Sequence, residues 1–177
     1  EDKDIPMLRD QVVLSLVQGC KSNIYNLDSV ALKMLNIIVI CSLGARIFHV
    51  REITGLFYSA SGGFGLGPNK EHIISVITPM LNCENAEKGE RLILAEVQKV
   101  IDEGITEQEL GDARQLYLNN ILSFFSNRFN IASNFAYMHD MDLGFDYYSK
   151  SWEEAINMTV EDLNDVAKKY YDTSNFN

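Results

Sequence analysis

Residues 44–63 change from a helical pattern to a strand pattern, and this change limits the possible folds more than any other feature. The first half repeats apolar residues at helical spacing: Ile47, Val50 and Ile53. Gly55 then supplies a helix stop signal. The second half alternates like a strand, with Leu56, Tyr58 and Ala60 on one face and Phe57, Ser59 and Ser61 on the other. The sequence therefore predicts a helix joined to a strand by a short turn.

Two polar side chains lie on either side of this turn. Arg51 falls near the end of the predicted helix, and Tyr58 falls seven residues later, inside the predicted strand. A long cation and a phenol in these places can converge beside the turn and bind a carbonyl oxygen. The alternative is structural: Arg51 pairs with a neighbouring acid such as Glu52, and Tyr58 packs against the protein.

The same segment comes close to a zinc motif. Residues His49 to Ile53 match four of the five positions of the inverted zinc-peptidase motif H-x-x-E-H. That motif needs two imidazoles one helical turn apart and a carboxylate that activates water. Ile53 stands in the place of the second histidine and cannot bind metal, so we expect no zinc here. His49 is then a polar position on a helix.

These residues also resemble the other half of that peptidase family. The pattern V-R-E-x-x-G-L-x-Y-S, preceded by R-I-F, is similar to the non-catalytic (C-terminal-type) domain of the insulinase/pitrilysin family of zinc metallopeptidases. Mitochondrial processing peptidase and many bacterial proteins belong to that family. One domain there carries H-x-x-E-H, and a homologous domain lacks it but contributes an Arg and a Tyr spaced like Arg51 and Tyr58. The resemblance extends from about Asp10 to Phe176.

The resemblance implies a non-catalytic half of a zinc-dependent endopeptidase. Arg51 and Tyr58 would bind a substrate carbonyl, and the domain would close a peptide chamber. No residue of this chain would be catalytic alone. Zinc would sit in a partner domain, in the same chain or in a separate subunit, and the substrate would be a peptide or an unfolded protein segment. The alternative is a catalytically dead structural or protein-interaction module of the same fold, because a fold alone does not fix a function.

The strand patterns predict an α+β fold. Three segments are expected in one antiparallel sheet with helices on one face: Gln11–Val17, Leu56–Ser61 and Glu71–Thr78. Gln11–Val17 carries apolar residues at positions of both faces, which favours a central strand. Residues 1–9 are expected to be a linker or frayed entry, and residues 10–177 a single domain. In the resembled family one more strand follows, beyond Asn177.

Helical patterns cover much of the rest. Residues 29–40 are apolar nearly all round, so this helix should be buried on more than one side. Another helix is expected from about Asn82 to Gly104. Capping signatures mark further starts: Thr106-x-x-Glu109, Ser151-x-x-Glu154 and Thr159-x-x-Asp162. The helix predicted over 127–139 should turn four residues inward: Phe129, Ala132, Phe135 and Ala136.

Composition excludes several classes of protein. An apolar fraction of 46% argues against disorder. Fifteen Lys and Arg face 25 Asp and Glu, and a net charge of −10 disfavours nucleic acid and anionic membranes as partners. No apolar run is long enough to span a membrane. The chain begins with Glu1 rather than Met, so we expect a fragment. The sequence leaves the compartment open between cytoplasm and periplasm.

Three remaining features favour structural roles. The cysteines Cys20, Cys41 and Cys83 are widely spaced, which favours buried thiols over a disulfide framework or a metal site. The glycines of residues 61–69 match neither phosphate-binding motif and precede a strand, so we expect a strand end and a hairpin turn there. His139 stands beside Asp140, but nothing completes a catalytic set.

Overall fold

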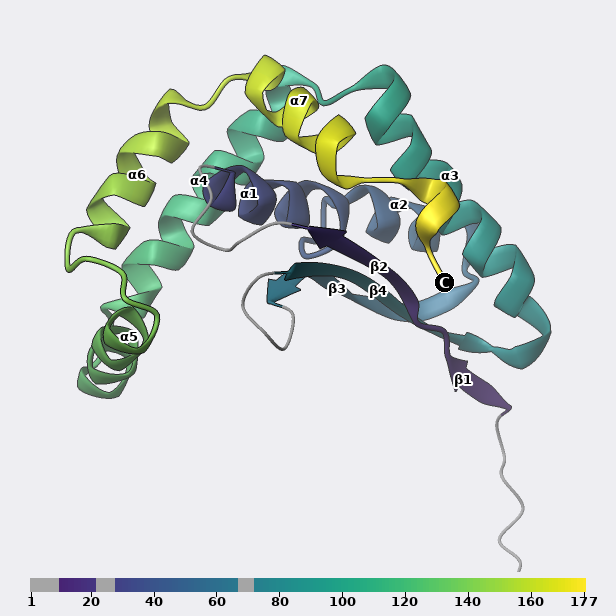
Figure 1. Cartoon of the computed structure of the whole chain (residues 1–177). Coiled ribbons are helices and arrows are strands. Elements are labelled where there is room, and N and C mark those ends of the chain that lie inside the picture. The colour runs from purple at the N-terminus through teal and green to yellow at the C-terminus, as the bar shows by residue number, and fades with distance from the viewer. Residues whose placement is uncertain (1–9, 22–27, 67–71) are drawn as a thin grey trace, which may run out of the picture.

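The computed structural model describes residues 10–21, 28–66 and 72–177. The expected linker, residues 1–9, and Glu71 of the third expected strand lie outside the described residues. The described chain forms an antiparallel sheet with helices on one of its faces (Figure 1), so the predicted α+β fold is confirmed. The strands are β1 (Gln11–Val13), β2 (Leu16–Lys21), β3 (Phe57–Leu66) and β4 (His72–Asn82).

Strand β4 lies at the centre of the sheet. It pairs antiparallel with β3 along one side, and with β2 and then β1 along the other. The hairpin of β3 and β4 confirms the two predicted hairpin strands and makes both of them longer. The face of the sheet that carries Phe57, Ile77 and Leu81 is buried beneath the helices.

The first predicted strand is not a single central strand. It divides at Leu14 and Ser15, and among the described strands β2 pairs only with β4. The register places Leu14 opposite Pro79, whose carbonyl oxygen accepts from the Leu14 N–H at 3.1 Å. Proline has no N–H to return the second bond of such a pair, so the ladder is interrupted there. On the outer edge of β2, Val17 and Asn177 exchange two backbone hydrogen bonds of 2.9 and 3.0 Å.

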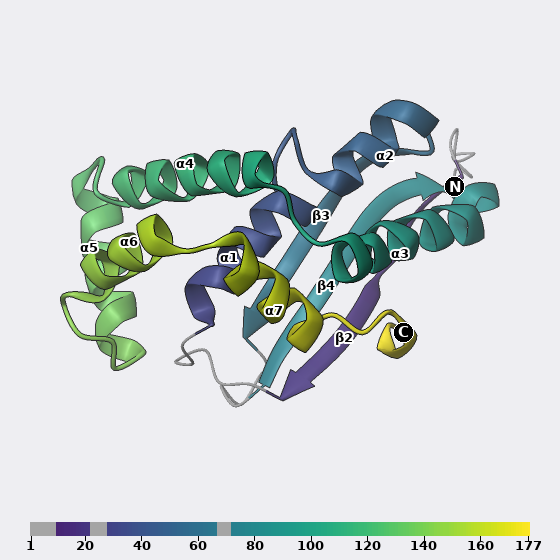
Figure 2. The same cartoon turned by 90° about the horizontal axis from the view of Figure 1, so that it is seen from above.

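Seven described helices cover one face of the sheet or extend beyond its end. They are α1 (Ser29–Val39), α2 (Arg46–Thr54), α3 (Ala86–Glu103), α4 (Glu107–Phe124), α5 (Arg128–Asp140), α6 (Tyr147–Asn157) and α7 (Val160–Tyr170). Helix α1 is buried nearly all round, as its pattern predicts, between the sheet and the outer helices. Residues 116–157, which we call the helical arm, extend away from the strands (Figure 2).

Two of the three capping signatures begin helices where the sequence predicts. Thr106 with Glu109, and Thr159 with Asp162, form complete capping boxes. The third prediction is wrong, because α6 begins at Tyr147 and Ser151 lies buried within it. The prediction for α5 is also wrong: Phe129 is 79% exposed, and Met138 is the buried residue. Helix α5 belongs to the arm, so no sheet lies beside it to cover those apolar positions.

The glycines expected in the hairpin turn begin inside β3. Gly62 and Gly63 have φ angles of 141° and 137°, which side-chain-bearing residues rarely adopt. A Cβ on Gly63 would lie 2.7 Å from Nδ2 of Asn36 in α1. The Oδ1 atom of Asn36 accepts from the Phe64 N–H at 2.8 Å. Gly63 thus lets α1 approach the outer edge of β3 and hydrogen-bond to it.

Two of the three cysteines do not form the expected buried thiols. Cys41 and Cys83 are free and exposed, and the Cys20 side chain lies outside the described part of the chain. The Cys41 thiol donates to the Gly62 carbonyl oxygen at 3.1 Å, and partial burial raises its pKa. Of the described helices, none is both long and apolar enough to cross a membrane.

Candidate functional site

A left-handed turn and a β-bulge position the two predicted site residues. Helix α2 ends at Gly55, which has a φ of 63° and whose N–H donates to the Arg51 carbonyl oxygen at 2.8 Å. Strand β3 then starts with Phe57, which is buried against the core. Phe57 pairs with Leu81 and Ser59 with Met80, so Tyr58 is the extra residue of a bulge between them.

The bulge overturns the strict alternation expected for this strand. Tyr58 is 74% exposed and Ser59 is also exposed, so two consecutive side chains leave the core. A bulge locally rotates a strand and redirects the side chain at the extra position. The result is a phenol held on the rigid start of a strand but directed to solvent.

The structure brings Arg51 and Tyr58 together. The guanidinium carbon of Arg51 lies 5.7 Å from the centre of the Tyr58 ring and 4.8 Å from the centre of the Phe48 ring. Among the described residues, neither the Arg51 guanidinium nor the Tyr58 hydroxyl has a hydrogen-bond or ion-pair partner. Glu52 instead faces His49, with 3.6 Å between its Oε2 and the imidazole Nδ1. The alternative in which Glu52 engages Arg51 is therefore not the arrangement found.

A hollow of about 500 Å³ opens beside this pair, and we call it the Arg51–Tyr58 hollow. It is lined by Gln11, Arg51, Glu52, Gly55, Leu56, Phe57, Tyr58, Met80, Leu81 and Asn82. Gln11 and Asn82 are register partners of β1 and β4, and both are exposed. The hollow therefore lies at the end of the sheet where β1 joins it, beside the C-terminal end of α2. Its lining combines a cation, a carboxylate, a phenol and two carboxamides.

The chemistry of this lining is that of binding. A guanidinium donates from the edges of its plane, a phenol donates one hydrogen bond, and carboxamides both donate and accept. The lining holds no His, Cys, Ser or Lys, and its two ionisable groups besides Arg51 are the Glu52 carboxylate and the Tyr58 phenol. Within residues 10–21, 28–66 and 72–177, no group of three His, Cys, Asp or Glu side chains lies close enough to hold a metal ion. The hollow can thus orient and polarise a carbonyl-bearing ligand.

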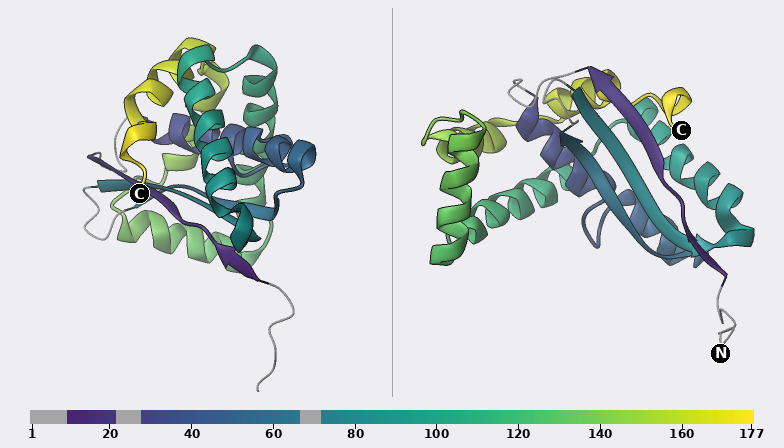
Figure 3. Two further views of the ribbon diagram at one scale, coloured as in Figure 1. Left: turned by 90° about the vertical axis from the view of Figure 1, so that its right-hand side faces the viewer. Right: turned by 60° about the horizontal axis from the view of Figure 1, so that its bottom comes forward.

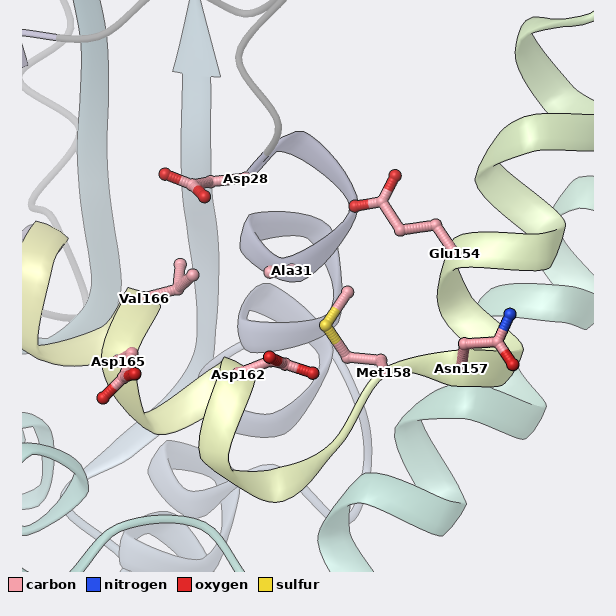
Figure 4. Close-up of a pocket in the computed structure, with 8 residues that line it drawn as sticks. All are labelled: Asp28, Ala31, Glu154, Asn157, Met158, Asp162, Asp165 and Val166. Carbon is pink, nitrogen blue, oxygen red and sulfur yellow. The ribbon is translucent and has the colours of Figure 1, made fainter.

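The structure contains a second hollow, of about 480 Å³, that no sequence pattern indicated. It lies between α1, α6 and α7, and four acidic side chains line it: Asp28, Glu154, Asp162 and Asp165 (Figure 4). Asp28 accepts from the Lys169 ammonium and the Tyr170 hydroxyl at 2.5 and 2.8 Å. Asp162 caps α7. Burial raises the pKa of Glu154, against the lowering effect of Lys33. Two of the four carboxylates thus have structural partners, and we assign this hollow no function.

Comparison with known proteins identifies the fold. No family model and no curated protein matches this sequence. Among solved structures, the peptidase M16 inactive domain from Pseudomonas fluorescens superposes with a TM-score of 0.79 at 21% identity, over 94% of this chain and 39% of that one. A protease from Helicobacter pylori gives a TM-score of 0.80 at 17% identity, over 94% and 39%. An inactive peptidase domain from Bordetella parapertussis gives 0.78 at 15% identity, over 98% and 94%.

These likenesses confirm the fold that the sequence resemblance implied. The chain spans 39% of the length of the first two matched proteins and 94% of the third. Over the 94–98% of its length that is matched, it therefore has the fold of an inactive peptidase domain, and it corresponds to one part of the longer proteins.

Proposed function

We propose that this chain is the non-catalytic half of a zinc-dependent endopeptidase, and that Arg51 and Tyr58 bind the carbonyl oxygen of a peptide substrate. The observation that carries the proposal is the pair itself. A guanidinium and a phenol lie side by side at one exposed surface, and neither has a polar partner among the described residues. The shared fold with peptidase inactive domains supports the same function.

The role of the pair follows from the charge that develops during peptide cleavage. When water attacks a peptide carbonyl, its oxygen becomes an oxyanion, and donors already aimed at that position lower the barrier. Removing one such donor typically lowers the rate by roughly 100- to 1,000-fold. Arg51 supplies a permanent charge and several donors, and Tyr58 supplies a neutral donor on a strand. Both would act on a substrate held between this domain and its partner.

The zinc ion belongs in this proposal to the partner domain. The residues here do not fit zinc: His49 and Glu52 are 3.6 Å apart, Ile53 replaces the second histidine, and the described residues supply no third ligand. When bound in a partner domain, zinc lowers the pKa of a coordinated water. This chain would contribute substrate binding and one wall of the chamber.

The uncovered sheet face suits such a wall. None of the described helices lies over that face, and the helical arm stands beside the end of the sheet away from β1 (Figure 3). The Gln11 and Asn82 carboxamides line the hollow next to Arg51 and can hydrogen-bond to the N–H and C=O groups of an extended peptide. A homologous domain closing over this face would enclose the peptide.

The test measures peptide cleavage by the chain assembled with its zinc-bearing partner. Arg51→Ala and Tyr58→Phe should each lower kcat by roughly 100-fold or more and change KM little, because each removes a donor needed mainly in the transition state. Arg91→Ala, at an exposed position of α3, is the matched control and should cleave at the parental rate. Parental rates for both Arg51→Ala and Tyr58→Phe would refute the proposed role.

A second candidate function is a protein-interaction module without activity. The observation that favours it is the helical arm, which exposes several large apolar side chains, among them Phe129, Phe135 and Phe145. Contiguous exposed apolar surface is typical of protein contacts. This candidate predicts a stable complex whose formation does not need Arg51 or Tyr58.

A further inference from the structure

Arg51 is flanked by two aromatic rings, and the nearer one is not part of the predicted site. Its guanidinium carbon lies 4.8 Å from the centre of the Phe48 ring and 5.7 Å from that of Tyr58. Both distances are within the range of cation–π contacts. Phe48 precedes Arg51 by three residues in α2, and long helical side chains turn back toward the preceding turn. The helix itself therefore lays the Arg51 side chain along Phe48.

The two rings differ in how firmly they are held. Tyr58 is 74% exposed, whereas Phe48 is partly buried in the first turn of α2. No acid or carbonyl among the described residues fixes the Arg51 guanidinium, since the neighbouring Glu52 faces His49. Contact with the Phe48 ring is therefore the closest interaction that defines where the guanidinium lies.

An aromatic neighbour suits a residue whose donors must stay available. A guanidinium donates all its hydrogen bonds within its own plane, while an aromatic ring attracts it through its face. An acid at this place would instead occupy those donors and neutralise the charge. Phe48 can thus restrict the Arg51 side chain and still leave the guanidinium N–H donors available to a carbonyl oxygen.

We propose that Phe48 is a positioning residue that holds the Arg51 guanidinium beside Tyr58 with its N–H donors free for the substrate carbonyl. This inference rests on the proposed function of the pair. Phe48 itself need not touch the substrate. Its whole contribution passes through Arg51, and this dependence makes the inference testable.

The experiment is a double-mutant cycle on the chain assembled with its zinc-bearing partner. Phe48→Leu keeps an apolar side chain but removes the ring, and should lower kcat about two- to five-fold with little change in KM, the size expected of one exposed cation–π contact. Phe48→Tyr keeps the ring and should restore the parental kcat. In an Arg51→Ala background, Phe48→Leu should have no further effect. Ile53→Ala, 71% exposed on the same helix, is the control and should be silent.

The possible outcomes separate this inference from the function on which it rests. A parental rate for Arg51→Ala refutes the proposed role of Arg51, and the inference falls with it. An impaired Arg51→Ala with an unimpaired Phe48→Leu refutes the Phe48 inference alone. An equal loss from Phe48→Leu in both backgrounds also refutes it, because Phe48 would then act by another route.

A second measurement needs neither partner nor substrate. Protons of a side chain stacked over a ring face resonate upfield, so the Arg51 Hδ and Hε protons should be shifted upfield in the NMR spectrum of the isolated chain. The shift should shrink in Phe48→Leu and persist in Phe48→Tyr and Ile53→Ala. Unchanged Arg51 resonances in Phe48→Leu would overturn the assignment.

Discussion

At the scale of single residues, what matters is whether a polar atom has a hydrogen-bond partner and whether it is exposed to solvent. Arg51 and Tyr58 keep polar donors at the surface, where solvent or a ligand can satisfy them. Ser75 shows the opposite situation, because it faces the core from β4 and is fully buried, and its hydroxyl has no hydrogen-bond partner in the described chain. An unmatched polar atom costs little when exposed and much when buried.

Removal of the Ser75 hydroxyl should therefore not harm the fold. We expect Ser75→Ala to leave the free energy of unfolding unchanged or to raise it by about 1 kcal/mol, because the buried hydroxyl has lost its hydrogen bonds to water and has gained none in the protein. Urea titration of the isolated chain measures this. Ser151→Ala is the matched contrast: Ser151 is also buried but is hydrogen-bonded to Tyr117, so its loss should destabilise by about 1–2 kcal/mol. A loss of 2 kcal/mol in Ser75→Ala would contradict the assignment.

At the scale of elements, the contact of α1 with β3 shows how two distant segments are fitted to each other. Asn36 of α1 hydrogen-bonds to the Phe64 N–H, and Gly63 leaves the space that this side chain needs. Gly63 thus serves a helix contact. The outer edge of β3 is satisfied there by side chains, which also limits pairing with another strand.

Gly63→Ala tests this fit. The new Cβ would meet Asn36 Nδ2 at 2.7 Å, and the φ of 137° is unfavourable for any residue with a side chain, so we expect a loss of about 1–3 kcal/mol in stability. Gly65→Ala, in the same strand, is the control. Its Cβ would meet nothing within 4 Å, and its stability should stay within about 1 kcal/mol of the parent. Thermal unfolding of both variants compares them, and equal midpoints would refute the role of Gly63.

The whole molecule depends on contacts that join its layers, and Arg46 provides one of them. From the first turn of α2 its guanidinium binds the Glu109 carboxylate at 2.6 and 2.9 Å and the Gly104 carbonyl oxygen at 2.6 Å. Glu109 also completes the capping box of α4. One ion pair thus connects α2, which carries Arg51, to the junction of α3 and α4. The position of α2, and with it of Arg51, relative to α3 and α4 depends in part on this contact.

Acid should weaken that connection. Burial raises the pKa of Glu109, but Arg46 and the Thr106 N–H and hydroxyl outweigh it, and the pKa lies below its ordinary value. A carboxylate with a depressed pKa stabilises the fold above its unfolded pKa of about 4.3, and this stability is lost as pH falls through the folded value. Glu109→Gln should therefore cost about 1.5–3 kcal/mol at pH 7 and much less near pH 3.

Urea titrations at the two pH values measure this difference. Glu107→Gln, at an exposed position in the same helical turn, is the control and should change stability little at either pH. An equal cost of Glu109→Gln at pH 7 and pH 3 would mean that the ion pair contributes nothing that depends on the charge of Glu109.

The sequence by itself determined the local features of this protein. These features depend on residues a few positions apart: the capping boxes at Thr106 and Thr159, the helix stop at Gly55, and the apolar residues on all sides of α1. Sequence patterns of this kind therefore identify the helices, the hairpin and the α+β fold. The proximity of Arg51 and Tyr58 could be predicted in the same way, because the helix end and the next strand are adjacent in the chain. Their proposed role came from the family resemblance.

Tertiary structure alone decided the features whose partners are far apart in sequence. The break between β1 and β2 requires the register that sets Leu14 against Pro79. The bulge that directs Tyr58 outward requires the pairing of Phe57 with Leu81 and of Ser59 with Met80. The exposure of Phe129 follows from an arm that extends past the sheet, although its spacing resembles that of a core residue. The spacing of apolar residues indicates which residues share a face of a helix or strand, but only tertiary packing determines whether another element covers that face.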